Sequence, residues 1–231
     1  MNRDALRPFV HAVLNVFHSP ALSDLNHRLL WAMRAARWMH QNPMPQLPNR
    51  YMLYDRAIEK YNLAETPITY LEFGVFKGAS IKYWVEKNHH PDSQFRGFDT
   101  FVGLPERWGH RDTGTFSTEG RTPAIDDPRC AFEVGFVQQT LSAALEKVNL
   151  ERQLVVHYDL DLYGPTLFTL IHLHRYMKPG DLILFDELVT INADTHEFRA
   201  LNDYLEAVHS AIKLKPVATS RHGANTCLEV Q

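Results

Sequence analysis

The sequence lacks the features that mark an exported or membrane protein. Its two cysteines, Cys130 and Cys227, form no CxxC pair and no disulfide framework, which is typical of a reducing compartment. No run of about 18 apolar residues occurs. His11 and Asn15 interrupt the N-terminal stretch FVHAVLNVF, and no small-residue cleavage site follows it. We therefore expect a cytoplasmic protein with no membrane span.

The sequence also lacks an excess of charge of one sign. The formal net charge is −3, and Lys and Arg are scattered among Asp and Glu, so there is no basic patch for nucleic acid. Small molecules or proteins are the expected partners. Of the 231 residues, 45% are hydrophobic, which suits one globular domain with a full-sized core, and no internal repeat is visible.

The N-terminal part is predicted to be helical. Apolar residues recur at helical spacing over residues 4–18 and 21–40, and again over 50–62. Between them, residues 42–49 contain three prolines and form a linker that cannot continue a helix. We therefore divide the chain into residues 1–49, helices and Pro-rich linker, and 50–231, the main domain. The N-terminal helices could form a lid, an acceptor wall or a subunit contact in a homo-oligomer.

From residue 68 onward, strands and helices alternate. The predicted strands are ITYLEF, FRGFDTF, CAFEVGF, RQLVVHYDL, DLILFDE, PVATS and TCLEV, and the predicted helices span residues 78–88, 137–148, 165–177 and 195–210. This alternation predicts an α/β fold with a mainly parallel sheet and helices on both faces. The last two strands, joined by a short turn, should be antiparallel.

The stretch YLEFGVFKGAS places two glycines directly after a predicted strand. Gly74 and Gly78 would let a ligand approach the backbone at the carboxyl edge of the sheet. The dinucleotide fingerprint GxGxxG would need further glycines where Phe76 and Ala79 stand, so pyrophosphate binding is poorly supported. Glu72 also argues against pyrophosphate binding, because a carboxylate repels phosphate and accepts hydrogen bonds from an ammonium group. Alone, the motif could equally be a structural turn.

Asp99 ends the next predicted strand, in RGFDTF. An acidic side chain at this place is typical of a contact to the two hydroxyls of a ribose. As a single residue, Asp99 could be an ordinary turn aspartate. Together with Glu72 it favours a ligand that contains a nucleoside.

Four more carboxylates follow two later strands. Asp159 and Asp161 end one strand, and Asp186 and Glu187 end the next. Carboxylates on neighbouring strand ends repel one another unless a positive charge lies between them, and Mg²⁺ takes such oxygen ligands. The alternative is structural, with Asp161 capping a helix and Glu187 exposed in a loop. For Asp159 and Asp186, which directly follow apolar strands, we favour a metal.

Taken in order, five stretches resemble the macrocin O-methyltransferase family: YLEFGVFKGAS, FRGFDTFVGLPERW, GTFST, VHYDLDLYGPTLFTL and KPGDLILFDE. The similarity covers roughly residues 50–205. It implies a class I S-adenosylmethionine-dependent enzyme with a seven-stranded, Rossmann-like sheet. Such enzymes methylate sugar hydroxyls during macrolide biosynthesis, using Mg²⁺ and a histidine base.

The resemblance also implies roles for individual residues. Glu72, Gly74 and Gly78 would cradle the methionine part of the cofactor, Asp99 would hold the ribose, and Phe73 and Ser80 would complete the cofactor site. The catalytic metal would bind to Asp159, Asp186 and Glu187, where Glu187 replaces the second aspartate of the family's Asp-Asp pair. The histidine base would be His110, in RWGHRDTG.

We thus predict an S-adenosylmethionine-dependent O-methyltransferase, assisted by Mg²⁺ or a similar cation, that acts on a hydroxyl of a sugar or other small natural product. Two alternatives remain within this fold: an O-methyltransferase for catechols or phenols, and a protein that binds S-adenosylmethionine without catalysis. An NAD-dependent oxidoreductase ranks third, because the glycines are misplaced.

Overall fold

The computed structural model describes residues 8, 10, 13, 20–190, 196–209 and 211–231. The first predicted helix, over 4–18, lies outside these residues except at three single positions. The helices are α2 (Pro20–Gln41), α3 (Arg50–Tyr61), α4 (Ala79–Lys87), α5 (Val137–Leu145), α6 (Tyr163–Leu173) and α7 (His196–Ala207), with short 3₁₀ turns η1 (His174–Tyr176) and η2 (Arg221–Gly223). The strands are β1 (Gln46–Leu47), β2 (Ile68–Phe73), β3 (Gln94–Asp99), β4 (Cys130–Val134), β5 (Gln153–Tyr158), β6 (Leu182–Phe185), β7 (Leu214–Ser220) and β8 (Asn225–Val230).

The strands form a single mixed sheet in the order β1-β7-β8-β6-β5-β2-β3-β4. Strand β8 is antiparallel to both neighbours, β6 and β7, and the other pairings are parallel. The predicted α/β class, the mainly parallel sheet and the antiparallel closing pair are all confirmed.

The sheet has eight strands rather than the predicted seven. The additional strand, β1, lies inside the Pro-rich linker, where Gln46 and Leu47 pair with the end of β7. The linker also accepts a hydrogen bond from Thr219 N at Pro45 O, at 2.9 Å. Proline prevents a helix here but is compatible with an extended edge strand. The division of the chain at residue 49 stays a prediction.

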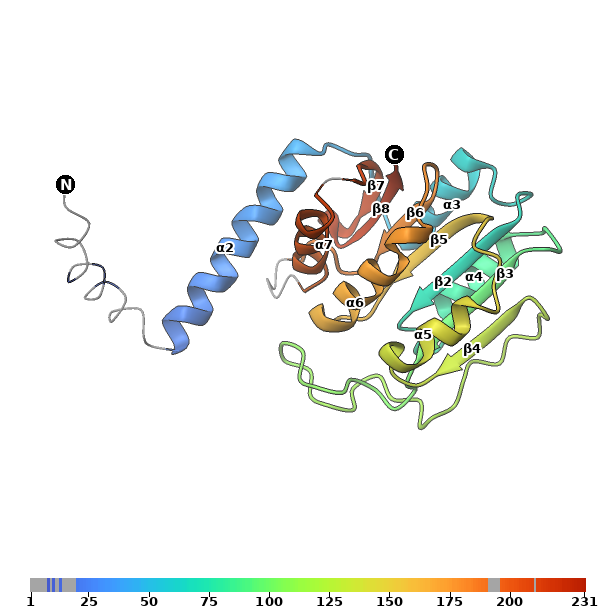
Figure 1. Cartoon of the computed structure of the whole chain (residues 1–231), viewed down its shortest axis with the longest axis horizontal. Helices are drawn as coiled ribbons and strands as arrows, with labels where there is room; N and C mark the ends of the chain where they lie inside the picture. Colours follow the sequence, from blue (N-terminus) through green and yellow to red (C-terminus); the bar gives the residue numbers. More distant parts are fainter. Residues whose placement is uncertain (1–7, 9, 11–12, 14–19, 191–195, 210) are drawn as a thin grey trace.

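Helices cover both faces of the sheet, with α3 and α4 on one face and α5, α6 and α7 on the other (Figure 1). All six residues of β2 are buried. Because side chains alternate along a strand, Tyr70 packs into the core under α3 and α4, while Leu71 and Phe73 pack into the opposite core. The central strands are therefore shielded from water on both faces, and only their ends are available for a ligand.

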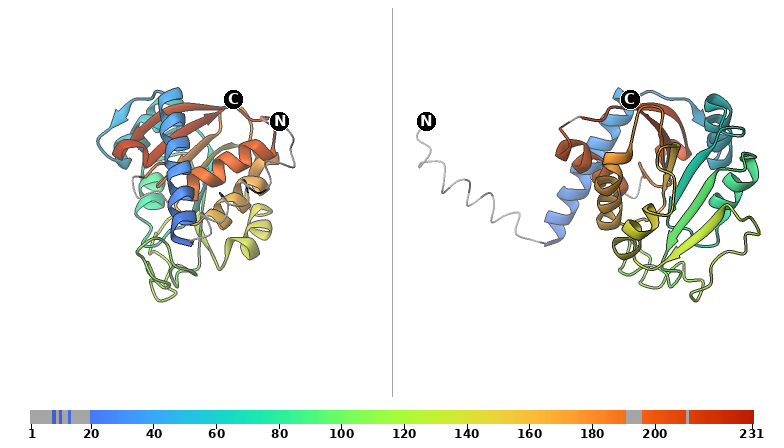
Figure 2. Two further views of the ribbon diagram at one scale, coloured as in Figure 1. Left: turned by 90° about the vertical axis from the view of Figure 1, so that its left-hand side faces the viewer. Right: turned by 45° about the vertical axis from the view of Figure 1, so that its right-hand side comes forward.

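Helix α2 packs beside α7, outside the sheet (Figures 1 and 2). Trp31 and Trp38 each make an edge contact with Phe198 of α7, with ring centroids 6.3 and 5.9 Å apart. Leu25 and Met33 are exposed, Met33 to 71%.

In the described part of the chain, no helix combines the length and apolarity needed to cross a bilayer.

Candidate functional site

A row of four stacked aromatic rings runs beneath the carboxyl ends of β3, β2, β5 and β6. Ring centroids are 4.8 Å apart for Phe98 and Phe73, 5.5 Å for Phe73 and Tyr158, and 5.1 Å for Tyr158 and Phe185. All four side chains are almost fully buried. Offset stacks of this kind are favourable beyond the area that they bury. The row holds four neighbouring strand ends at one level.

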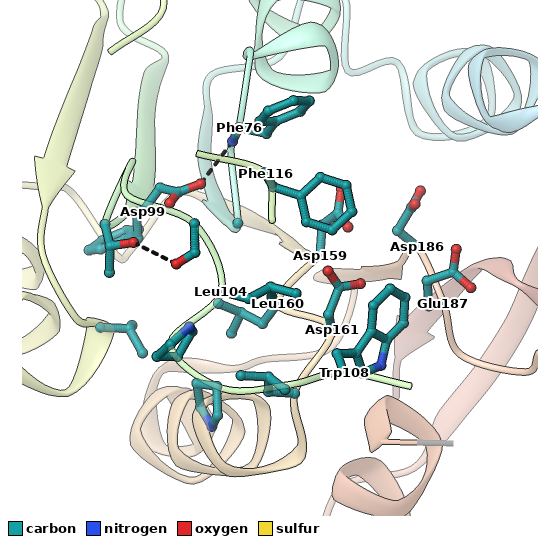
Figure 3. Close-up of a pocket in the computed structure, with 18 of the residues that line it drawn as sticks. Phe76, Asp99, Leu104, Trp108, Phe116, Asp159, Leu160, Asp161, Asp186 and Glu187 are labelled. Atoms are coloured by element: carbon teal, nitrogen blue, oxygen red, sulfur yellow. Dashed lines mark hydrogen bonds between the residues drawn. The ribbon is translucent and has the colours of Figure 1, made fainter. Parts of the chain in front are cut away.

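The residues that directly follow these four rings line one cavity of about 620 Å³. They are Asp99, Gly74, Asp159 and Asp186. The cavity volume lies within the usual range for small-molecule sites, and a parallel sheet commonly binds ligands at this edge. Loop residues between β3 and β4, including Leu104, Trp108 and Phe116, complete the wall (Figure 3).

Gly74 is required by a close approach between two strand ends. Its φ is +86°, and a Cβ atom at this position would lie 1.8 Å from the backbone oxygen of Asp159. Gly74 N donates a hydrogen bond to Phe98 O at 2.9 Å. Any other residue would force β2 and β5 apart at the floor of the cavity.

Asp99 organises the turn that follows β2. Its Oδ2 accepts hydrogen bonds from the backbone N–H groups of Val75 and Phe76, each at 2.8 Å, and its Oδ1 accepts one from Phe101 N at 2.8 Å. A carboxylate has about four lone-pair sites. Asp99 can therefore accept a further hydrogen bond from a ligand hydroxyl while it holds this loop in place.

Glu72 and Ser80 do not lie in the cavity lining, although the sequence predicts both as cofactor ligands. Glu72 is 1% exposed and accepts a hydrogen bond from Tyr70 Oη at 2.5 Å, with His157 Nδ1 at 3.4 Å. Ser80 Oγ is 3.2 Å from Tyr54 Oη. Glu72 shares a face of β2 with Tyr70, so it points into the core under α3 and α4 rather than past the strand end.

Two other residues that the sequence predicts as cofactor ligands, Phe73 and Gly78, take part in packing contacts of the fold. Phe73 belongs to the aromatic row. Gly78 precedes α4 with φ of +76°, and a Cβ atom there would lie 2.7 Å from the Pro123 side chain. Gly78 therefore allows the long loop before β4 to pack against the start of α4.

Four carboxylates project into the same side of the cavity: Asp159, Asp161, Asp186 and Glu187 (Figure 3). Burial raises the pKa of Asp159, and the charges of Asp186 and Asp161 raise it further. Burial, Glu187 and Asp186 likewise raise the pKa of Asp161, and burial and Asp186 raise that of Glu187. Three arginines, Arg50, Arg111 and Arg221, also line the cavity, and the pKa values of Asp159, Asp161 and Glu187 are raised in spite of their positive charge.

Asp186 is nevertheless well bonded. Arg50 Nη2 lies 3.1 Å from Asp186 Oδ2, and Asn225 Nδ2 donates to Asp186 Oδ1 at 2.6 Å and to its backbone oxygen at 2.9 Å. Ser220 Oγ donates to Asn225 Oδ1 at 2.8 Å, which fixes the orientation of the amide. Sequence reasoning missed Arg50 and Asn225, because only the fold brings them to the end of β6.

A fifth carboxylate, Glu197, lies behind the cluster. It is 1% exposed, its Oε2 accepts a hydrogen bond from Glu187 N at 3.1 Å, and its Oε1 has no partner among the described residues. Across those residues, no group of three or more His, Cys, Asp or Glu side chains is arranged to hold a metal ion. The predicted ligands Asp159, Asp186 and Glu187 share a cavity but are not a ready-made coordination set.

His110 is not brought to the cavity. It is exposed in a two-residue turn between Trp108 and Arg111, whose backbones exchange hydrogen bonds at 2.9 and 2.8 Å. Of the described residues that line the cavity, none is a histidine. The Arg111 guanidinium stacks on the rings of Phe116 and Trp108, at 4.7 and 5.3 Å. This turn therefore presents Trp108 and Arg111 to the cavity and gives His110 no support as the base.

Comparison with known proteins gives a fold match without a family assignment. No protein-family model matches the chain, and no curated protein matches it in sequence. The resemblance to macrocin O-methyltransferases thus stays a prediction.

Solved structures share the fold. CalS11, described as a calicheamicin methyltransferase, superposes with a TM-score of 0.58 at 22% identity and covers 91% of this chain and 93% of its own. The O-methyltransferase NovP gives a TM-score of 0.56 at 17% identity, covering 78% of this chain and 79% of its own. CmcI, in a structure described as holding Mg and SAM, gives 0.50 at 15% identity, covering 80% and 72%. The chain has the Rossmann-like fold of these proteins.

Proposed function

We propose that the protein is an S-adenosylmethionine-dependent O-methyltransferase that acts on a hydroxyl of a small molecule such as a sugar or other natural product. One observation carries the proposal: Gly74, Asp99 and a cluster of carboxylates line a single cavity at the carboxyl edge of the sheet. The descriptions of the three similar structures as methyltransferases, or as holding SAM, support it.

The cofactor's nucleoside belongs beside Asp99. Its ribose hydroxyls would donate to the remaining lone pairs of this carboxylate. Gly135 N donates to Asp99 O at 3.0 Å, so the residues after β4 adjoin Asp99, and Phe136 and Val137 line the same cavity. These apolar side chains offer a surface for the adenine ring. The positive sulfonium would then face the carboxylates at the ends of β5 and β6.

The donor chemistry of the cluster fits a hard divalent cation, because buried carboxylates that raise one another's pKa need positive charge and offer only oxygen ligands. Asp159, Asp186 and Glu187 would hold the ion. When bound, Mg²⁺ would lower the pKa of the acceptor hydroxyl and fix its direction.

The acceptor belongs between Trp108 and the carboxylates, which line the same cavity (Figure 3). A flat indole suits the apolar face of a sugar ring, and Asp161, which lines the same cavity, would accept the proton of the hydroxyl. S-adenosylmethionine would supply the methyl group: the bond to the acceptor oxygen would form as the carbon–sulfur bond breaks, and neutral S-adenosylhomocysteine would be left. The loop of Trp108 and Phe116 would keep water from this reaction.

A methyl-transfer assay with radiolabelled S-adenosylmethionine tests the proposal, using sugar and catechol acceptors in parallel. Transfer to a sugar hydroxyl is the expected outcome. Transfer only to catechols would instead indicate a catechol or phenol O-methyltransferase. Cofactor binding without transfer to any acceptor would instead indicate a non-catalytic binding protein. Nicotinamide binding in a fluorescence titration would contradict the cofactor assignment.

A further inference from the structure

Arg50 connects the N-terminal part of the main domain to the carboxylate cluster. It is the first residue of α3, directly after Asn49, whose side chain caps the helix by accepting from Met52 N at 3.0 Å. From there its Nη2 reaches to within 3.1 Å of Asp186 Oδ2. Burial lowers the pKa of Arg50, but the charge of Asp186 raises it more than any other neighbour does, and the pKa lies above its usual value. The guanidinium of Arg50 thus forms an ion pair with the carboxylate at the end of β6.

The side chains of Asp186 and Arg50 differ in how freely they can move. The Asp186 side chain is 6% exposed and is fixed by Asn225, which is itself fixed by Ser220. The Arg50 side chain is 29% exposed and ends a flexible stem. When a second cation reaches Asp186, the arginine can move into solvent, whereas Asp186 cannot turn away.

We propose that Arg50 is a displaceable internal cation: it neutralises Asp186 when no divalent ion is bound, and the ion and the guanidinium compete for that carboxylate. The inference rests on the cation site of the proposed function. It accounts for two observations together, namely that the carboxylates share a cavity and that, among the described residues, they are not arranged as a coordination set. Arg50 holds one of them in an ion pair.

The competition has a measurable consequence. A unit positive charge a few ångströms from a divalent ion weakens ion binding by electrostatic repulsion. Movement of the arginine into solvent reduces that penalty. Removal of the charge should therefore tighten ion binding, by at least about tenfold.

Binding of Mn²⁺, followed through the electron paramagnetic resonance signal of the free ion, tests the idea on the full chain without cofactor or acceptor. Arg50→Gln should bind Mn²⁺ at least about tenfold more tightly than the wild-type protein, and Arg50→Lys, which keeps the charge, should lie close to wild type. Arg221→Gln is the matched control. Arg221 lines the same cavity, but no ion pair joins its side chain to Asp186 or to another described carboxylate, so its loss should change Mn²⁺ affinity by less than about threefold.

A double-mutant cycle assigns the effect to the ion pair. In an Asp186→Asn background, Arg50→Gln should change Mn²⁺ affinity by less than about twofold, because the shared carboxylate is gone. Equal affinities of wild type and Arg50→Gln, or an equal gain in Arg221→Gln, would overturn the inference. If neither the wild-type protein nor any variant bound Mn²⁺, both this inference and the proposed cation site would be overturned. The proposed cofactor site would not be affected, because titration with S-adenosylmethionine tests it independently.

A second measurement needs no folded Arg50→Gln protein. The Nε–Hε resonance of Arg50, assigned by its loss in Arg50→Lys, should shift during a Mg²⁺ titration with the same midpoint as ion binding. A resonance that stays unmoved at saturating Mg²⁺ would show that the ion leaves the Arg50–Asp186 pair intact, against the proposal.

Discussion

Gly74 and Asp159 meet so closely that a Cβ atom on the glycine would lie 1.8 Å from the aspartate's backbone oxygen. The ends of β2 and β5 thus touch backbone to backbone at the floor of the cavity. The position of Asp159, and with it that of the carboxylate cluster, depends on the absence of a side chain at residue 74.

Gly74→Ala should therefore destabilise the protein by about 2 to 4 kcal/mol and abolish cofactor binding, because the clash adds to the strain of a positive φ. Gly114→Ala is the control: Gly114 has φ of +83°, but no described atom beyond its chain neighbours lies within 4 Å of the place that a Cβ atom would take. It should lose only about 1 to 2 kcal/mol. Urea unfolding measures both variants, and equal losses would contradict the role of the close contact.

Asp99→Asn should weaken binding of S-adenosylmethionine about 10- to 100-fold, because an amide leaves one of the three backbone N–H donors facing an NH₂ group. Asp112→Asn is the control, since the Asp112 side chain is 87% exposed in the loop that follows. Isothermal titration calorimetry compares the two variants. Undiminished binding by Asp99→Asn would remove Asp99 from the cofactor site.

Removal of divalent ions should abolish methyl transfer while S-adenosylmethionine affinity changes by less than about tenfold, because the cation is proposed to act on the acceptor hydroxyl. Transfer should return when excess Mg²⁺ is added after EDTA, but not in Asp159→Asn. An EDTA-treated enzyme with full activity would exclude the cation from the reaction and leave the cofactor site intact.

The ion pair between Asp127 and Arg129, at the end of the loop between β3 and β4, can be tested through the pH dependence of stability. Its carboxylate accepts from the guanidinium of Arg129 at 2.8 Å, and these hydrogen bonds hold the pKa of Asp127 below its usual value. The same guanidinium donates to Val85 O and Asn88 O, so the pair attaches the loop to the end of α4.

Asp127→Asn should lower the free energy of unfolding by about 1 to 3 kcal/mol at pH 7. A lowered folded-state pKa means that the unfolded state takes up the proton first in acid. The stabilisation by Asp127 is therefore complete above the unfolded pKa, about 4, and is lost as the pH falls through the folded pKa. Urea unfolding at pH 7, 5 and 3.5 should show the deficit of the variant shrinking only at the lowest pH; a constant deficit would contradict the ion pair.

The sequence predicts the ends of the strands well, because a polar residue that directly follows a buried apolar strand must stand at the edge of the sheet. This reasoning places Asp99, Asp159 and Asp186, and all three line the cavity. Glu72 shows its limit. Glu72 is the fifth of the six residues of β2, all of which are buried. Because both faces of the strand are buried, the sequence does not indicate which core the Glu72 side chain enters.

Contacts between distant parts of the chain could not be predicted. The pairing of Arg50 with Asp186 depends on where α3 packs, and no local pattern reports it. His110 lies in a loop whose path follows from the pairing of Trp108 with Arg111. The prolines of residues 42–49 excluded a helix correctly, but they gave no signal for the two-residue strand that pairs with β7.

Calorimetric titration of the wild-type chain with S-adenosylmethionine tests the central claim most directly. We predict saturable binding of one molecule per chain, with no heat from NAD under the same conditions. A protein that is folded by circular dichroism and yet binds no S-adenosylmethionine would contradict the account.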